Sequence, residues 1–123
     1  MGKFSRDKGK RGERSTATEL RECFPELAEE IRRGWQAREG DDEADVIGVP
    51  GYWFEVKAGK SIQILKALEQ AHSASVNKRS IAVPVAVLRP DRKEPFVALY
   101  WTDFLMIIRR IFDYEYGQTR KDR

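Results

Sequence analysis

The segment Asp45–Lys57 reads DVIGVPGYWFEVK and contains two short apolar runs separated by Pro50-Gly51. Valine, isoleucine and aromatic residues favour strands, and a Pro-Gly pair suits a tight turn. We therefore predict two antiparallel strands joined by this turn. In such a hairpin the start of the first strand returns towards the end of the second, so we expect Asp45 to lie near Glu55 and Lys57.

Glu55 and Lys57 are two residues apart, which places their side chains on one face of an extended strand while Val56 points to the opposite face. With Asp45, two carboxylates and one ammonium then converge. Carboxylate oxygens are typical ligands of Mg²⁺ and Mn²⁺, ions that also bind phosphate oxygens. The pattern indicates a metal-dependent phosphodiesterase site.

The alternative is a partly exposed structural ion pair, because Glu-x-Lys is common on the outer face of strands. The aromatic residues Trp53 and Phe54 and the aliphatic Val56 surround the two charges in a strand that otherwise reads as largely buried. This context favours the functional interpretation.

The chain has 123 residues, of which 41% are hydrophobic and 35% are charged, so we expect one domain with a modest core and an ionic surface. The formal net charge of +3 is unevenly distributed. Residues 1–14 carry six Lys or Arg against two acidic residues, and residues 120–123 carry three against one. We predict a flexible basic arm at 1–8, a single domain at 9–116 and a basic tail at 117–123. Basic ends favour a polyanionic partner.

The single cysteine, Cys23, excludes an intramolecular disulfide and fits a reducing compartment. The sequence contains no run of about 20 apolar residues that could span a bilayer, and its basic start lacks the apolar run of a secretion signal. We therefore expect a cytoplasmic protein, in the host cytoplasm if it is phage-encoded, with no membrane partner.

Hydrophobic periodicity and turn residues predict the remaining elements. They are a helix over 9–33 broken at Pro25, a strand over 35–38, the hairpin strands, a helix over 62–77 capped by Ser61, strands over 81–88 and 96–101, and a helix over 103–112 capped by Thr102. This αβββαββα order predicts an α/β fold, a small mixed sheet flanked by helices. Pro84 indicates an edge or a bulge in its strand. We expect Trp35, Trp53 and Trp101 to anchor the core, because each lies in or beside a predicted strand.

The element order, the Asp45, Glu55, Lys57 trio and the opening KGKRGER of residues 8–14 together resemble the PD-(D/E)XK nuclease superfamily, which has a restriction-endonuclease-like core. Within it the chain is most similar to archaeal and phage Holliday junction resolvases. Those proteins carry a basic, glycine-containing start, a glutamate on the first helix, an aspartate opening the second strand and Glu-x-Lys on the third. Glu13 supplies the matching glutamate. The resemblance covers about residues 8–77, and Ala44 stands where the family pattern has proline.

The resemblance implies that Asp45 and Glu55 hold Mg²⁺ or Mn²⁺, with the backbone carbonyl of Val56 as a third protein ligand. Lys57 would orient or deprotonate the attacking water. Glu13 would reach a second ion or a metal-bound water.

Two of these residues also have a structural alternative. Glu13 could instead form a surface ion pair with Arg11 or Arg14. Gln70, on the predicted second helix, either hydrogen-bonds the site or lies at the helix surface.

DNA is the expected partner, and its contacts are expected from basic residues near the ends and loops: Lys8, Lys10, Arg11, Arg14, Arg38 and Lys60. The chain has no base-reading motif, which favours recognition of the DNA backbone and shape, as in a four-way junction. Paired cuts in a junction favour a homodimer. The apolar segment from Phe96 to Phe112 supplies either that dimer interface or part of the core.

Three hypotheses follow from the sequence. The first is a metal-dependent, structure-selective DNA endonuclease of recombination and repair, of the Holliday junction resolvase type. The second is a related restriction, repair or single-strand nuclease. The third is a non-enzymatic nucleic-acid-binding module.

Overall fold

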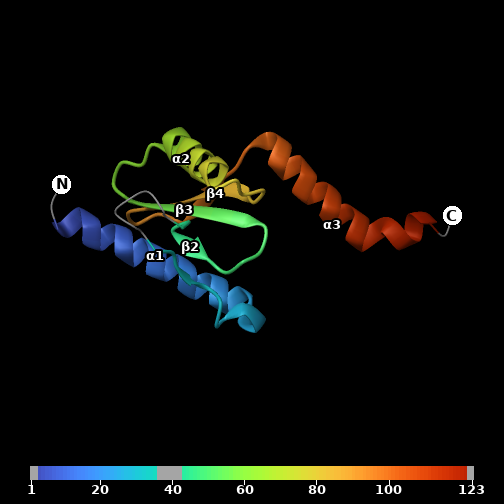
Figure 1. The fold of residues 1–123 in the computed structure, drawn as a ribbon, viewed down its shortest axis with the longest axis horizontal. Coiled ribbons are helices and arrows are strands. Elements are labelled where there is room, and N and C mark those ends of the chain that lie inside the picture. The colour runs from blue at the N-terminus through green and yellow to red at the C-terminus, as the bar shows by residue number, and fades with distance from the viewer. Residues whose placement is uncertain (1–2, 36–42, 122–123) are drawn as a thin grey trace.

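The computed structural model of the protein describes residues 3–35 and 43–121. Two long helices stand at the ends of this part of the chain, and five strands and a shorter helix lie between them (Figure 1). The bounds are α1 Lys3–Cys23, η1 Pro25–Leu27, β1 Arg32–Arg33, β2 Val46–Ile47, β3 Tyr52–Gly59, α2 Ile64–Asn77, β4 Val83–Pro90, β5 Phe96–Ala98 and α3 Trp101–Lys121. The predicted α/β class and the order of helices and strands are confirmed.

These strands form one mixed sheet in the order β1-β2-β3-β4-β5. Strands β3 and β4 run parallel, in a register that pairs Tyr52 with Val83 and Gly59 with Pro90, and α2 connects them. The other neighbours are antiparallel. A parallel pair needs a crossover connection, which explains why the helix lies between these two strands in the sequence.

The hairpin of β2 and β3 is antiparallel, as predicted, with Val46 opposite Phe54. Gly51 in the turn has φ +91°, a left-handed conformation that glycine adopts without strain. Beyond the two residues of β2, the backbone of Asp45 continues the pairing on both sides. Its N–H donates to the carbonyl of Phe54 at 3.0 Å, and its carbonyl accepts from the N–H of Gly34 at 2.8 Å.

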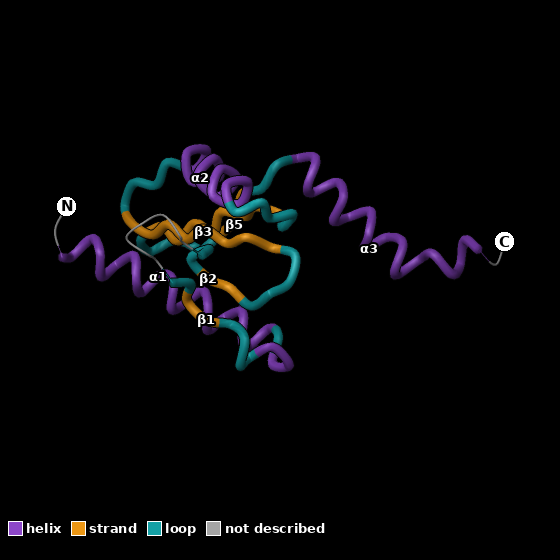
Figure 2. The backbone as a smooth tube through the Cα atoms, in the orientation of Figure 1, coloured by secondary structure: helices purple, strands orange, loops and turns teal. Residues whose placement is uncertain are grey.

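Helices cover both faces of the sheet, with α1 on one face and α2 on the other (Figure 2). The larger core cluster lies on the α1 face and includes Ala17 of α1 with Val85 and Val87 of β4. The smaller cluster lies on the α2 face and includes Leu68 with Leu88 of β4. Strand β4 is therefore buried on both sides, which explains its uninterrupted apolar run.

Pro84 lies within β4, opposite Trp53 of β3. Strand β5 pairs with β4 at Ala86–Leu88, so at Pro84 the strand has β3 as its neighbour and no partner from β5. The prediction of a sheet edge at Pro84 is confirmed for this half of β4.

Several predicted boundaries were wrong. Helix α1 begins at Lys3 and not near Gly9, so the basic residues from Lys3 onward are helical. After α1 only the single turn η1 follows at Pro25. The first strand is Arg32–Arg33, with Trp35 beyond its end, and the rest of the strand predicted at 35–38 lies outside the described residues. Gln63 stands at the N-cap of α2 without a side-chain hydrogen bond, so Ser61 does not cap this helix.

Helix α3 is longer than predicted and begins at Trp101, which places Thr102 inside the helix. It extends away from the sheet, and its far end lies well clear of the body of the molecule (Figure 1). Trp35 and Trp101 are 67% and 68% exposed, so the prediction that they anchor the core was wrong, while Trp53 is partly buried. None of the helices in the described ranges is both long and apolar enough to cross a membrane.

Candidate active site

Asp45 lies just before β2, where its side chain reaches across to β3. Its carboxylate oxygen Oδ2 accepts a hydrogen bond of 2.8 Å from the backbone N–H of Val56. Val56 stands between Glu55 and Lys57 in the sequence, so the hairpin brings Asp45 back to the Glu-x-Lys segment, as predicted.

The environment of Asp45 raises the pKa of its carboxyl group from 3.8 to about 6. Burial is the main cause, because it penalises the charged form, and the negative charge of Glu13 acts in the same direction. The hydrogen bond from Val56 and the positive charges of Lys57 and Arg33 lower the pKa and offset part of this shift. The neighbouring groups therefore offset the cost of the negative charge on Asp45 only in part. A bound cation would stabilise the ionised carboxylate.

Glu13 of α1 forms an ion pair with Arg33 of β1, with 3.0 Å between Oε1 and Nε. The expected surface partners were Arg11 and Arg14, both of which are exposed. Sequence reasoning missed Arg33 because it placed this residue in a helix. Had residues 32–33 been recognised as a strand pairing with β2, their register opposite Val46 and Ile47 would have placed Arg33 beside Asp45.

The close contact between α1 and β3 shows which side chains of β3 face α1. A Cβ atom at Gly12 would lie 3.1 Å from the Cβ of Ala58 and 3.5 Å from Cγ1 of Val56, so these side chains face α1. Glu55 and Lys57 consequently face the α2 side. There they line an open depression of about 390 Å³ whose walls also include Lys66, Glu69 and Gln70 of α2.

Gln70 and Lys57 also line an adjoining depression of about 250 Å³ towards Ser61. Gln70 therefore lies at the helix surface and beside the Glu-x-Lys segment at the same time. Its two alternatives are not mutually exclusive in this geometry.

The candidate residues fall into two groups that share Lys57. Asp45, Glu13 and Arg33 interact around the end of β2, and the charge of Lys57 acts on Asp45. Glu55 and Gln70 lie with Lys57 at the depression under α2. Val56 connects the two groups. Its N–H donates to Asp45, and its neighbours in the sequence, Glu55 and Lys57, line the depression of the second group.

The fit of a metal ion depends on which ion is considered. Within the described residues, no three His, Cys, Asp or Glu side chains gather closely enough to hold a metal by themselves. Mg²⁺ does not need such a cage, because proteins usually hold it through one or two carboxylates together with water and substrate phosphates. Asp45, whose carboxylate interacts electrostatically with that of Glu13, fits this requirement.

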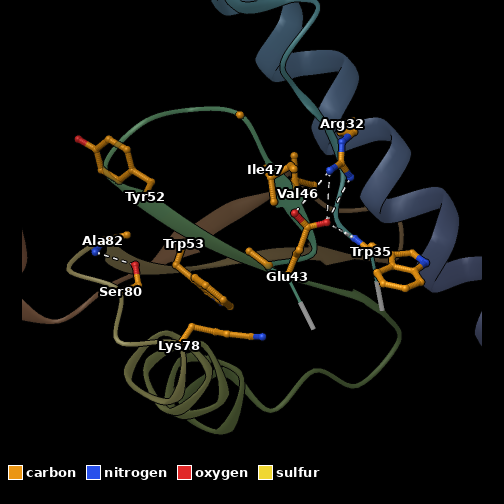
Figure 3. Close-up of a pocket in the computed structure, with 12 residues that line it drawn as sticks. Arg32, Trp35, Glu43, Val46, Ile47, Tyr52, Trp53, Lys78, Ser80 and Ala82 are labelled. Carbon is orange, nitrogen blue, oxygen red and sulfur yellow. Dashed lines mark hydrogen bonds and ion pairs between the residues drawn. The ribbon is translucent and has the colours of Figure 1, made fainter. Parts of the chain in front are cut away.

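A third depression, about 820 Å³, was not anticipated from the sequence and lies along the same side of the sheet (Figure 3). Trp53, two residues before Glu55, and Lys78 beyond the end of α2 both extend into it. On its other side Glu43 pairs with Arg32 at 3.3 Å and accepts the backbone N–H of Trp35 at 2.8 Å. The Nε1 atom of Trp53 is buried without a hydrogen-bond partner among the described residues.

The basic residues expected to contact DNA lie in different settings. Lys10, Arg11 and Arg14 are exposed on α1, and Lys60 is exposed after β3. Lys8 forms an ion pair of 2.8 Å with Asp91 in the turn after β4. Arg38 lies outside the described residues.

No protein-family model, curated protein or solved structure matches this chain. The interpretation of the site therefore depends on its geometry and electrostatics.

Proposed function

We propose that the protein is a metal-dependent nuclease that hydrolyses phosphodiester bonds in DNA. The observation that carries this proposal is the carboxyl group of Asp45, which is partly buried, is hydrogen-bonded to Val56 and feels the charges of Glu13 and Lys57. Burying a carboxylate near a second carboxylate opposes folding, and groups perturbed in this way concentrate at functional sites.

In this proposal Asp45 and Glu55 hold Mg²⁺ or Mn²⁺. The carbonyl of Val56 is a suitable third ligand, because in a strand the C=O of a residue leaves on the same side as its N–H, which here faces Asp45. The bound ion would lower the pKa of a water molecule and offset negative charge at the phosphate.

The other residues position the reactants. The ammonium group of Lys57 orients the attacking water or the scissile phosphate, since Lys57 lines the same depression as Glu55 and its charge acts on Asp45. Arg33 holds the side chain of Glu13 near Asp45, where Glu13 adds negative charge to the site.

The surface favours DNA that is recognised by backbone and shape. Lys10, Arg11 and Arg14 form an exposed basic segment of α1, the helix that also carries Glu13. The depression that Trp53 lines offers an aromatic ring to an unstacked base. Together with the resemblance to Holliday junction resolvases, these features make branched DNA, first the four-way junction, the proposed substrate.

The decisive experiment compares cleavage of an end-labelled four-way junction and a linear duplex, with and without Mg²⁺ or Mn²⁺. We expect metal-dependent cleavage of the junction. Equal cleavage of both substrates would instead count against the resolvase type and favour a related nuclease of other specificity. Binding without cleavage in every metal tested would indicate a non-enzymatic nucleic-acid-binding module.

Variants test the residues directly. Glu55→Gln and Lys57→Met should each reduce the cleavage rate by about 10²-fold or more while junction binding persists. Glu69→Gln is the matched control, because Glu69 lines the same depression but has no proposed role. A Glu55→Gln protein that cuts at the wild-type rate would refute the site.

A further inference from the structure

Helix α3 carries a stripe of large apolar side chains along one side. Its members are Trp101, Phe104, Leu105, Ile108, Ile111 and Phe112, with the i, i+3, i+4, i+7 spacing of an amphipathic helix. Every member is exposed, from 38% for Phe112 to 68% for Trp101. The sequence thus encodes a helix face for burial that the described chain leaves open to solvent.

The described body of the molecule does not cover this stripe. Helix α3 extends away from the sheet and its helices (Figure 1), and Ile107, which lies off the stripe, is a residue of α3 that packs against the core. Contiguous exposed apolar surface of this kind marks an interaction site. With roughly 150–250 Å² for each full side chain, the stripe exposes on the order of 500 Å². A stable interface buries about 800 Å² on each partner, so the stripe could form most of one.

We propose that the α3 stripe is a self-association surface on which a second copy of this chain docks its own α3. The members of the stripe are all uncharged, so they call for an equally apolar partner surface. The nearby charges of Arg109 and Asp113 already pair with each other within the helix at 3.2 Å. A two-fold pairing of identical stripes buries both apolar faces at once and leaves these charges at the rim.

The shape of the molecule favours an antiparallel pair. Helix α3 joins the body at its N-terminal end, so antiparallel pairing of the stripes, which run from Trp101 to Phe112, places the two bodies at opposite ends of an overlap about 18 Å long. The opposed helix dipoles also favour this direction. The proposal does not depend on nuclease activity. If both proposals hold, the dimer carries two copies of the site, as paired cuts in branched DNA require.

The test measures the mass of the full chain in solution by light scattering and sedimentation at roughly 1–100 μM, the range in which interfaces of modest affinity form. We expect twice the chain mass of 14.3 kDa. The double variant Leu105→Asp, Ile108→Asp should weaken association by about 100-fold or more, because it places charges in a desolvated interface. Circular dichroism and thermal unfolding should show that the variant keeps its fold, since both side chains are already exposed.

Tyr114→Asp is the matched control, because Tyr114 is 90% exposed on the same helix but lies off the stripe. This variant should dimerise as the wild type does. A wild-type protein that stays monomeric throughout this range would overturn the proposal. So would a Tyr114 variant that dissociates as readily as the double variant.

Discussion

Asp45 links the electrostatics of the site to the stability of the fold. Its carboxyl pKa is about 6 in the folded protein against an ordinary value of 3.8, so the folded state binds more protons between these two values. The cost of this carboxylate is absent below about pH 4, grows as the pH rises and is complete above about pH 6. Without divalent metal, Asp45→Asn should therefore raise the free energy of unfolding by about 1–2 kcal/mol at pH 7.5 and change little at pH 4.

Urea unfolding at the two pH values, in buffer containing a chelator, measures this difference. Asp113→Asn serves as the control, because Asp113 belongs to an exposed ion pair and its replacement should shift stability by less than about 0.5 kcal/mol at either pH. If Asp45→Asn destabilises the protein equally at both values, Asp45 acts through its hydrogen bond to Val56 and not through its charge.

A bound divalent cation should offset the destabilisation caused by the ionised carboxylate of Asp45. Saturating Mg²⁺ should stabilise the wild-type protein by about 2.7 kcal/mol when the ion is present at a hundred times its dissociation constant. The Asp45→Asn variant should gain much less, because it lacks a proposed ligand. Thermal unfolding with and without Mg²⁺ provides the measurement, with Glu69→Gln as the variant expected to respond as the wild type does. Equal gains in the wild type and Asp45→Asn would place any bound ion elsewhere.

The packing of α1 on β3 depends on a glycine that lies in close contact with the sheet. A Cβ atom at Gly12 meets Ala58 at 3.1 Å, whereas a Cβ atom at Gly9, one turn earlier, has no atom within 4 Å. Gly12→Leu should destabilise the protein by roughly 1–3 kcal/mol through overpacking. Gly9→Ala should stabilise it by roughly 0.5–1 kcal/mol through helix propensity alone.

Denaturant unfolding distinguishes these two substitutions in the same helix. Because Gly12 neighbours Glu13, displacement of α1 should also lower the stabilisation by Mg²⁺. A Gly12→Leu protein as stable as the wild type would mean that α1 can move on the sheet at little cost.

Local sequence patterns correctly predicted the elements that depend on residues close together in the sequence. The Pro-Gly turn between two apolar runs gave the hairpin, and Asp45 came to lie beside Val56 as expected. The ion pair of Glu13 with Arg33 could not be predicted in this way, because it joins a helix to a strand of two residues whose formation depends on pairing with β2. The start of α2 was misplaced because Ser61 satisfies the sequence preference for a cap, while the chain begins the helix after Gln63.

At the scale of the whole molecule, the sequence could not distinguish a helix that packs on its own core from one that packs on another chain. An amphipathic stripe has the same spacing in both cases. The exposed Trp101 and Ile108 are therefore informative only when the position of α3 relative to the sheet is known. The same reasoning applies to Trp35, whose place in a predicted strand suggested burial, although it follows a short edge strand and is 67% exposed.

The proposed DNA contacts depend on where positive charge is exposed on the whole molecule. Lys10, Arg11 and Arg14 are exposed on α1 and should contact phosphates, so binding should weaken steeply as salt rises. Replacing all three by Gln should reduce the slope of log K against log[salt] by up to about 0.9 for each phosphate that the variant no longer neutralises. Fluorescence anisotropy with a labelled junction at several salt concentrations measures this slope.

Replacing Arg109 and Arg110 of α3 by Gln removes exposed charge of the same sign from a different surface. An equal decrease of the slope in that control would mean that DNA responds to the net charge, whereas a decrease confined to the α1 variant places the DNA on the helix that carries Glu13.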